Sequence, residues 1–222
     1  MKVSEVKTKL LDLLTPFSNE IGYKINKNRF SISKEHNNIN ATLQFTTNSW
    51  FDEVQIMPSV NVNIKEINDI WKMFNEYASI TYSMNLNELK DWYDLGVVSW
   101  EKFQLNKKDR HQIFNYETDL MHANLEIQYL FNKYGLRYIN DFGSIEGVNK
   151  LYNQSLDDLK SYHCAGFQVR SVVGLIAAKL SNNPDYIKIS EFYTNKINEH
   201  KLNDTMTKKD IEIFFKVKAY LG

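Results

Sequence analysis

An alternation of apolar and polar side chains between residues 39 and 64 constrains the fold more than any other feature of this chain. Successive side chains of an extended strand point to opposite faces, so residues 39–46 predict a strand with one apolar face. A second alternation over residues 54–64 predicts another strand, and Pro58 interrupts it at an inward position. Because proline cannot donate a hydrogen bond to a neighbouring strand, we expect a bulge or a sheet edge at Pro58.

Two shorter segments before residue 39 show the same alternation. Residues 23–25 and 30–33 flank Asn26-Lys27-Asn28, and asparagine tolerates the positive φ of a tight turn. We therefore expect a hairpin around Lys27-Asn28. Four strands joined by short loops predict an antiparallel meander with one face toward solvent.

Helical spacing appears on both sides of this segment. Apolar residues over 3–21 follow one face of a helix that ends at Gly22, with Pro16 as a kink or an earlier stop. The spacing over residues 63–78 predicts a second helix. Shorter patterns predict a strand over residues 80–86, a helix over 86–93 and a strand over 97–105.

From residue 108 onward the apolar spacing is helical. We expect a long helix that begins at Asp109, reaches Tyr134 and is closed by Gly135. One row along this helix is apolar, and further apolar residues lie alongside it. The row holds Ile113, Leu120, Ile127 and Tyr134, and the residues alongside are Phe114, Met121 and Leu125.

The remaining helices are predicted from their end signals and from one strongly apolar segment. Residues 168–180 are apolar around more than one face, which predicts a central buried helix. Within it, Gly174 and Ala178 would let another element approach closely. The predicted helix starts are Asp141 or Ser144, Ser155, Gln168, Pro184 and Thr207.

These patterns together predict an α+β fold. An N-terminal helix and an antiparallel meander sheet occupy residues 1–107, and an all-helical half occupies residues 108–222. The chain has only eight Gly and three Pro, and no stretch rich in these residues or in Ser separates the halves. We therefore expect one compact unit over residues 1–222, or two tightly docked lobes, and not free domains.

The charge balance argues against nucleic acid as a partner. Lys plus Arg number 27 and Asp plus Glu also number 27, whereas affinity for a duplex comes largely from clustered cations. Aromatic residues make up 14% of the chain. We expect most of them to fill the core, the alternative being a binding face rich in Trp and Tyr.

The cysteine content and the apolar segments bear on the compartment. The single cysteine, Cys164, cannot form a disulfide within the chain. The first residues carry charges and lack the uninterrupted apolar segment of a signal peptide. The longest strongly apolar stretch, residues 172–180, is too short to cross a bilayer. We therefore expect a cytoplasmic protein with no membrane partner, and the richness in Asn, Lys, Ile and Tyr suggests a bacterial source.

Sequence motifs for catalysis or cofactor binding are absent. The chain contains no Gly-rich phosphate loop, no H-E-x-x-H metal signature and no G-x-S-x-G elbow. His122 and Glu126 share a helix face, and residues 143–147 precede a helix, but a surface pair and an ordinary helix start account for them. We assign no catalytic residue, no metal ligand and no cofactor.

The first site hypothesis is a partner-binding loop between two predicted strands. It consists of Trp50, Phe51, Asp52 and Glu53. Aromatic rings at a turn are costly to expose, so Trp50 either folds back onto the core or presents an interaction surface.

The second site hypothesis is a ligand pocket or enzyme site in the helical half, formed by His122, Cys164 and Arg170. A histidine that the fold brings within hydrogen-bond reach of a cysteine can activate its sulfur as a nucleophile. A small buried hydrophobic residue is the alternative role for Cys164.

The segment Lys133–Glu146 has the sequence Lys-Tyr-Gly-Leu-Arg-Tyr-Ile-Asn-Asp-Phe-Gly-Ser-Ile-Glu. With the order of N-terminal helix, Gly-Tyr-Lys-Ile hairpin, alternating strands and helical tail, it resembles a class of uncharacterised bacterial proteins. Some members are encoded beside toxins and are regarded as immunity proteins. The resemblance implies a protein-interaction domain that neutralises a toxin, and it carries over no active-site residue. An enzyme or small-ligand-binding protein, and a self-associating homo-oligomer, are the alternatives.

Overall fold

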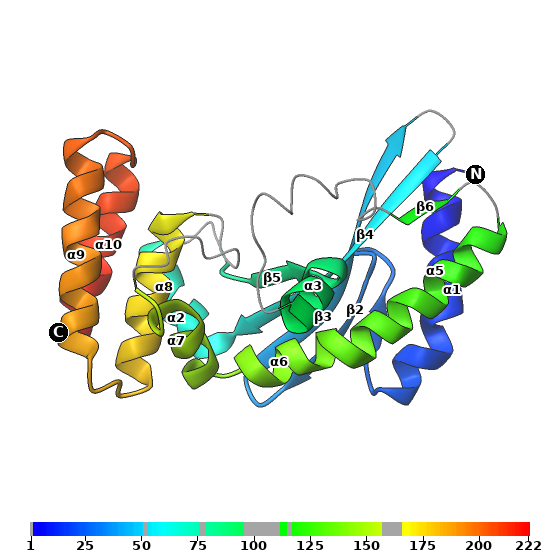
Figure 1. Cartoon of the computed structure of the whole chain (residues 1–222), viewed down its shortest axis with the longest axis horizontal. Coiled ribbons are helices and arrows are strands. Elements are labelled where there is room, and N and C mark those ends of the chain that lie inside the picture. Colours follow the sequence, from blue (N-terminus) through cyan, green and yellow to red (C-terminus); the bar gives the residue numbers. More distant parts are fainter. Residues whose placement is uncertain (1, 51–52, 76–78, 96–111, 115–116, 157–165) are drawn as a thin grey trace. The chain divides into compact units, whose positions relative to one another are not determined.

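The computed structural model describes residues 2–50, 53–75, 79–95, 112–114, 117–156 and 166–222 (Figure 1). Their secondary structure confirms the predicted α+β class, with an N-terminal helix, an antiparallel sheet and then mostly helices. The helices are α1 (Val3–Glu20), α2 (Lys65–Phe74), α3 (Leu86–Leu95), α5 (Glu117–Leu130), the π-helical turn η2 (Phe131–Gly135), α6 (Leu136–Phe142), α7 (Ile145–Asn153), α8 (Phe167–Leu180), α9 (Tyr186–Leu202) and α10 (Lys208–Leu221). The strands are β1 (Lys24–Asn26), β2 (Ser31–His36), β3 (Ile39–Trp50), β4 (Glu53–Ile64), β5 (Tyr82–Asn85) and β6 (Gln112–Phe114).

The chain forms two compact units, each built from two separate stretches of sequence. The first unit comprises Met1–Val62 and Ser83–Asn140, and the second comprises Asn63–Tyr82 and Asp141–Gly222. The predicted division between residues 107 and 108 falls outside the described residues, so it stays a prediction, as does a single compact unit over the whole chain.

The sheet belongs mainly to the first unit, and its strands follow the order β1-β2-β3-β4-β5. Antiparallel pairing places Ile25 opposite Ile32 and Ile32 opposite Leu43. The predicted meander of four strands is thereby confirmed. Two further strands extend it, because β5 pairs with β4 and β6 also pairs with β4, with Val54 opposite Phe114.

Strand β4 runs through Pro58 without a change of face. Val54, Ile56, Pro58, Val60 and Val62 are all buried, and the residues between them are half-buried. A bulge would insert one residue and shift this alternation, so the predicted bulge is wrong. Strand β4 pairs with β3, β5 and β6, but its register with β6 covers only residues 54–56, so a sheet edge at Pro58 itself stays a prediction.

The first hairpin forms as predicted, but a different residue carries the positive φ. Strand β1 ends at Asn26 and the loop holds residues 27–30, in which Phe30 has φ 47° and neither asparagine of the turn has a positive φ. The Phe30 ring is buried, and its centroid lies 5.1 Å from that of Phe45. Burial of the ring offsets the strain of a left-handed backbone.

Helix α1 ends at the predicted glycine. Gly22 has φ 72°, its N–H donates to the carbonyl of Asn19, and the N–H of Tyr23 donates to the carbonyl of Ser18. These two bonds form a Schellman cap, which satisfies carbonyls at the helix end. The helix continues past Pro16, so the alternative of an earlier stop is wrong.

The other elements predicted before residue 108 have counterparts wherever the structure describes them. The helix predicted over residues 63–78 is α2, the strand over 80–86 is β5, and the helix over 86–93 is α3. The strand predicted over residues 97–105 lies outside the described residues.

The long helix predicted from Asp109 to Tyr134 differs at both ends. Asp109 lies outside the described residues, and residues 112–114 form strand β6 instead of a helical turn. At the other end, Gly135 does not close the helix, because η2 passes directly into α6. The glycine serves packing instead: an added Cβ would lie 2.7 Å from Phe131 Cδ2 and 3.1 Å from Val60 Cγ2.

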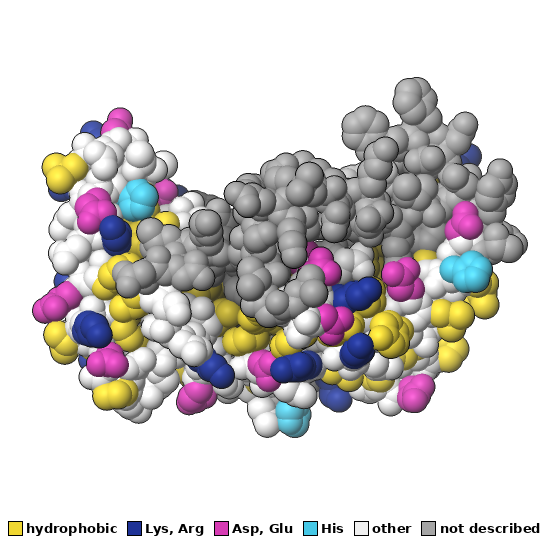
Figure 2. All heavy atoms as spheres, in the orientation of Figure 1, with side chains coloured by type: hydrophobic (Ala, Val, Ile, Leu, Met, Phe, Trp, Pro, Cys, Tyr) yellow, Lys and Arg dark blue, Asp and Glu magenta, His cyan; other side chains and the backbone are white. Residues whose placement is uncertain are grey.

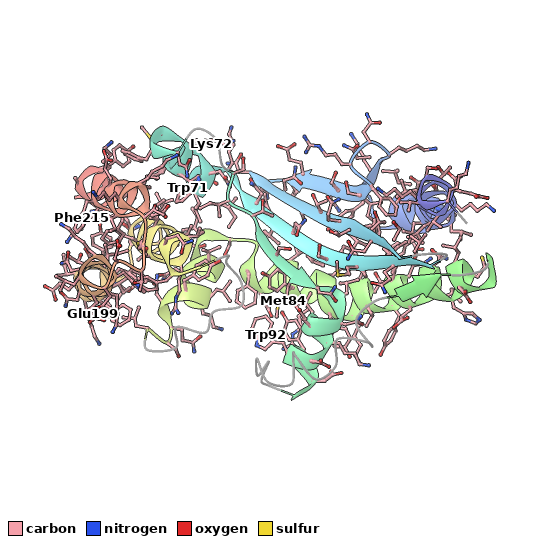
Figure 3. The ribbon with its side chains drawn as sticks, turned by 90° about the horizontal axis from the view of Figure 1, so that it is seen from above. Trp71, Lys72, Met84, Trp92, Glu199 and Phe215 are labelled. Atoms are coloured by element: carbon pink, nitrogen blue, oxygen red, sulfur yellow. The ribbon has the colours of Figure 1, made fainter. Side chains whose placement is uncertain are left out.

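Phe131 lies at the centre of the first unit's core. Its buried ring meets Phe17 of α1 and Tyr23 edge-on, at centroid distances of 6.1 Å and 5.6 Å. Figure 3 shows α5 and α6 running along one face of the sheet. Leu120 and Ile127 are buried on this side of α5.

The second unit is organised around α8, which confirms the predicted central buried helix. Every residue from Arg170 to Ala178 is buried, and α8 contacts α2, α7, α9 and α10. The close approach predicted at Gly174 is also confirmed. A Cβ there would lie 2.9 Å from Asn153 Oδ1 and 3.0 Å from Tyr193 Cε2.

Two of the predicted helix starts are confirmed by their caps. The Ser144 hydroxyl accepts a hydrogen bond from the Gly147 N–H at 2.9 Å, and Thr207 Oγ1 accepts one from the Asp210 N–H at 3.2 Å. Pro184 precedes the N-cap residue of α9, so its predicted place in the first helical turn is wrong. The helix predicted from Ser155 extends into residues outside the described part of the chain.

The close packing at Gly135 predicts a stability effect. Gly135→Ala adds a methyl group against Phe131 and Val60, so we expect the free energy of unfolding to fall by about 1–3 kcal/mol. Urea denaturation measures this change. Asn132→Ala, at an exposed position in the same turn, is the control and should change stability by less than about 0.5 kcal/mol. Equal stabilities for the two variants would contradict the packing argument.

Burial raises the pKa of Tyr23 to about 12, from 10.0 for a free tyrosine. Below pH 10 the phenol is neutral in both the folded and the unfolded chain, and it then adds no pH dependence. Between pH 10 and 12 the unfolded chain loses this proton while the folded chain keeps it, so the free energy of unfolding falls as pH rises. We expect Tyr23→Phe to make this fall shallower, as measured by urea denaturation at successive pH values. Equal slopes for the variant and the wild type would contradict the prediction.

Candidate functional site

The predicted partner-binding loop lies mostly beyond what the structure describes. Trp50 is the last residue of β3 and Glu53 is the first residue of β4. Phe51 and Asp52, and the side chains of Trp50 and Glu53, fall outside the described part. This loop therefore stays a prediction.

The residues of the predicted ligand pocket belong to different parts of the chain. His122 is exposed on α5 in the first unit, whereas Arg170 is buried on α8 in the second. Cys164 lies outside the described residues. A pocket formed by these three residues stays a prediction.

Arg170 has a role in packing within the second unit. Its Nη2 donates to the carbonyls of Tyr152 and Ser155, at 3.0 Å and 3.1 Å. These carbonyls lie at and just beyond the end of α7, where backbone acceptors have no intrahelical partner. A buried guanidinium that binds them stabilises the junction of α7 and α8.

Metal ligands do not gather in the described part of the chain. Its His, Cys, Asp and Glu residues form no group of three or more that could hold a metal ion. The glycine-containing segment over residues 143–147 begins α7 as an ordinary capped helix, as predicted.

The strongest candidate site is a row of exposed apolar side chains on α5. Met121, Leu125 and Tyr129 have 50%, 60% and 55% of their surface exposed. They are spaced four residues apart, so they lie on one side of the helix. The sequence placed Met121 and Leu125 alongside the buried row, but the structure turns both side chains toward solvent.

At the C-terminal end of this row, an ammonium group lies between two tyrosines. Lys133 Nζ donates a hydrogen bond to Tyr129 Oη at 3.1 Å. The same nitrogen lies 5.5 Å from the ring centroid of Tyr129 and 4.8 Å from that of Tyr134. Hydrogen bonds with Tyr134 and Tyr129 raise the pKa of Lys133, so its side chain is fully charged at physiological pH.

Tyr134 connects the π-helical turn to α3. Its ring is buried and its hydroxyl donates to Asp94 Oδ2 at 2.6 Å. Burial, followed by this hydrogen bond, raises the pKa of Tyr134. A short bond between a phenol and a carboxylate is among the stronger hydrogen bonds in proteins, so it orders both side chains.

Two aromatic side chains of α3, Trp92 and Tyr93, extend this cluster of rings beyond Tyr134. Tyr93 stacks on Tyr134 with centroids 6.4 Å apart and an interplanar angle of 17°. The guanidinium carbon of Arg137 lies 4.1 Å from the Tyr93 ring centroid, and the rings of Trp92 and Tyr93 are 5.1 Å apart. Lys133 thus lies between Tyr129 and Tyr134, and Arg137 lies over Tyr93, so a cation contacts each of these three tyrosine rings.

We call this set of residues the tyrosine–cation surface. It comprises Trp92, Tyr93, Asp94, Met121, Leu125, Tyr129, Lys133, Tyr134 and Arg137, all in the first unit. Figure 2 shows hydrophobic side chains lying among basic and acidic ones over α5 and α6, and Figure 3 labels Trp92 on α3. Tyr, Trp, Arg and Met are the residue types enriched at protein–protein interfaces.

No sequence motif pointed to this surface. One signal was available, because Met121, Leu125 and Tyr129 recur every four residues on the side of α5 opposite Ile127. The pairing of Tyr134 with Asp94 had no such signal, because 40 residues separate the two side chains.

Comparisons with protein-family models, with curated protein sequences and with solved structures found no match. Among the described helices, none has the length and apolar character needed to cross a membrane.

The bond between Tyr134 and Asp94 predicts energetic coupling between the two residues. We expect Tyr134→Phe and Asp94→Asn each to lower the free energy of unfolding by about 1 kcal/mol, and the double variant to lose less than the sum. Urea denaturation of the four proteins measures this coupling. Tyr129→Phe removes an exposed hydroxyl and should change stability by less than about 0.5 kcal/mol. Strictly additive effects of the two substitutions would contradict the coupling.

Proposed function

We propose that this protein is a protein-binding module and that its partner binds the tyrosine–cation surface. The observation that carries this proposal is the exposure of Met121, Leu125 and Tyr129, each at least half exposed on one side of α5. A contiguous apolar row of this kind costs free energy in water unless another surface covers it.

The side chains around this row support specific recognition. Rings and cations hold one another in place, as in the contacts of Lys133 with Tyr129 and Tyr134. Side chains that are ordered before binding lose less conformational entropy when the partner binds. Large rings and an arginine are also the residue types that contribute most binding free energy in alanine scans.

The resemblance to immunity proteins supports a finer form of the proposal. The segment that carries it, Lys133–Glu146, contains Lys133, Tyr134 and Arg137 of the tyrosine–cation surface. In this form the partner is a bacterial toxin, and the protein neutralises it by forming a stoichiometric complex.

Site-specific photocrosslinking tests the proposal in the native cell. With benzoylphenylalanine at position 125, we expect crosslinks to one predominant partner. The matched control is position 187, where Ile187 has a similar exposed fraction of 65% on α9 in the second unit. Crosslinking of the same proteins at both positions would contradict a partner site on α5.

Copurification with variants of this protein measures how strongly the partner binds. Leu125→Asp places a charge in the apolar row, so we expect at least a tenfold loss of the crosslinked partner, whereas Ile187→Asp should leave it unchanged. If the partner is encoded by the adjacent gene, inhibits growth when expressed alone and forms an equimolar complex, the toxin form is supported. A product containing only two copies of this chain would identify self-association and contradict the toxin form.

A further inference from the structure

The ammonium group of Lys133 is held in place by neutral groups. Its contacts in the structure are the hydroxyls and the rings of Tyr129 and Tyr134. Within the described part of the chain, no carboxylate lies within ion-pair distance of its Nζ. Among the residues that the structure describes, the cation is therefore positioned without being neutralised.

The acidic group on the same surface is already engaged. Asp94 Oδ2 accepts the short hydrogen bond from Tyr134, whose ring lies directly beneath the ammonium group at 4.8 Å. Tyr134 thus contacts both charged groups: its hydroxyl donates to the carboxylate, and the ammonium group lies over its ring face.

Two hydrogen-bond donors remain for an incoming group. An ammonium group has three N–H donors, and the hydrogen bonds of Lys133 with Tyr129 and Tyr134 use two of them, which leaves one. Because Tyr129 accepts in that bond, its own O–H is left to donate. Both side chains are exposed, and the apolar Leu125 lies one helical turn away on the same side of α5.

We infer that the partner contributes an acidic side chain flanked by apolar residues, whose carboxylate accepts hydrogen bonds from Lys133 Nζ and Tyr129 Oη. The flanking apolar residues of the partner contact Leu125 and Met121. This inference rests on the proposed function, because it specifies the chemistry of the segment that occupies the tyrosine–cation surface.

The two parts of this contact have different roles. An exposed ion pair is worth about 0.2–1 kcal/mol, so Lys133 alone does not retain a partner. Burial of apolar surface on Leu125 and Met121 provides most of the affinity. The positioned cation selects an acidic segment over a neutral one, because a neutral side chain there would leave the ammonium group desolvated and unpaired.

Selection from a random dodecapeptide library tests the inference even while the natural partner is unidentified. Peptides are selected on the full-length protein and counter-selected on the uncharged Leu125→Ser variant, so that peptides dependent on the apolar row are kept without a bias against acidic ones. We expect these peptides to be enriched in Asp or Glu next to apolar residues.

Fluorescence polarisation then measures the coupling. We expect Lys133→Gln, and replacement of the peptide's acidic residue by its amide, each to weaken binding about threefold or more, with no further loss when both are combined. Lys72→Gln, at an exposed lysine on α2 in the second unit, is the matched control and should leave binding unchanged. Figure 3 labels Lys72.

Failure of this inference can be distinguished from failure of the proposed function. Peptides that depend on Leu125 but are not enriched in acidic residues, or that bind Lys133→Gln as tightly as wild type, overturn this inference and leave the proposed function standing. If no peptide depends on Leu125, both the inference and the proposed site are overturned.

Discussion

The approach of the long helix to the sheet at Gly135 is the contact on which the first unit depends. The missing side chain lets the backbone of η2 lie against Val60 of β4 and the ring of Phe131. Phe131 in turn contacts Phe17 of α1 and Tyr23, which follows the α1 cap. One close approach therefore joins the N-terminal helix, the meander and the π-helical turn. The ring of Phe131 can contact all three only because the helix that carries it lies near the sheet.

The same contact fixes how α5 is rotated about its own axis. It therefore decides which side chains of α5 face solvent. Ile127 is buried on one side of α5, and Met121, Leu125 and Tyr129 on the opposite side face solvent. The widened turn at η2 then carries Lys133 and Tyr134 to the end of this row, where Tyr134 reaches Asp94 of α3. Such π-helical turns recur at functional sites, because they reposition side chains that a regular helix would place elsewhere. The proposed binding surface is thus a consequence of core packing.

The second unit uses its polar residues for internal structure. Arg170 binds carbonyls near the end of α7, and buried Asn68 binds both the N–H and the carbonyl of Ile80. Tyr193 donates to Asn153 at the site of close approach between α8 and α9. Each of these groups is buried and would be costly without its partners, so the described polar residues here explain stability more directly than they explain ligand binding.

The sequence by itself determined the features that depend on neighbouring residues. Alternation identified β3 and β4, helical spacing identified α1, α2 and α8, and Gly22, Ser144 and Thr207 marked helix ends through bonds to residues three or four positions away. Only the tertiary structure decided that Phe30 takes the positive φ, that Gly135 lies within a helix, that residues 112–114 form a strand, and that Leu125 is exposed beside a cation held by tyrosines. These outcomes depend on contacts between residues far apart in the chain. The recurrence of Met121, Leu125 and Tyr129 every four residues is periodic, but it does not by itself say which side of α5 faces solvent.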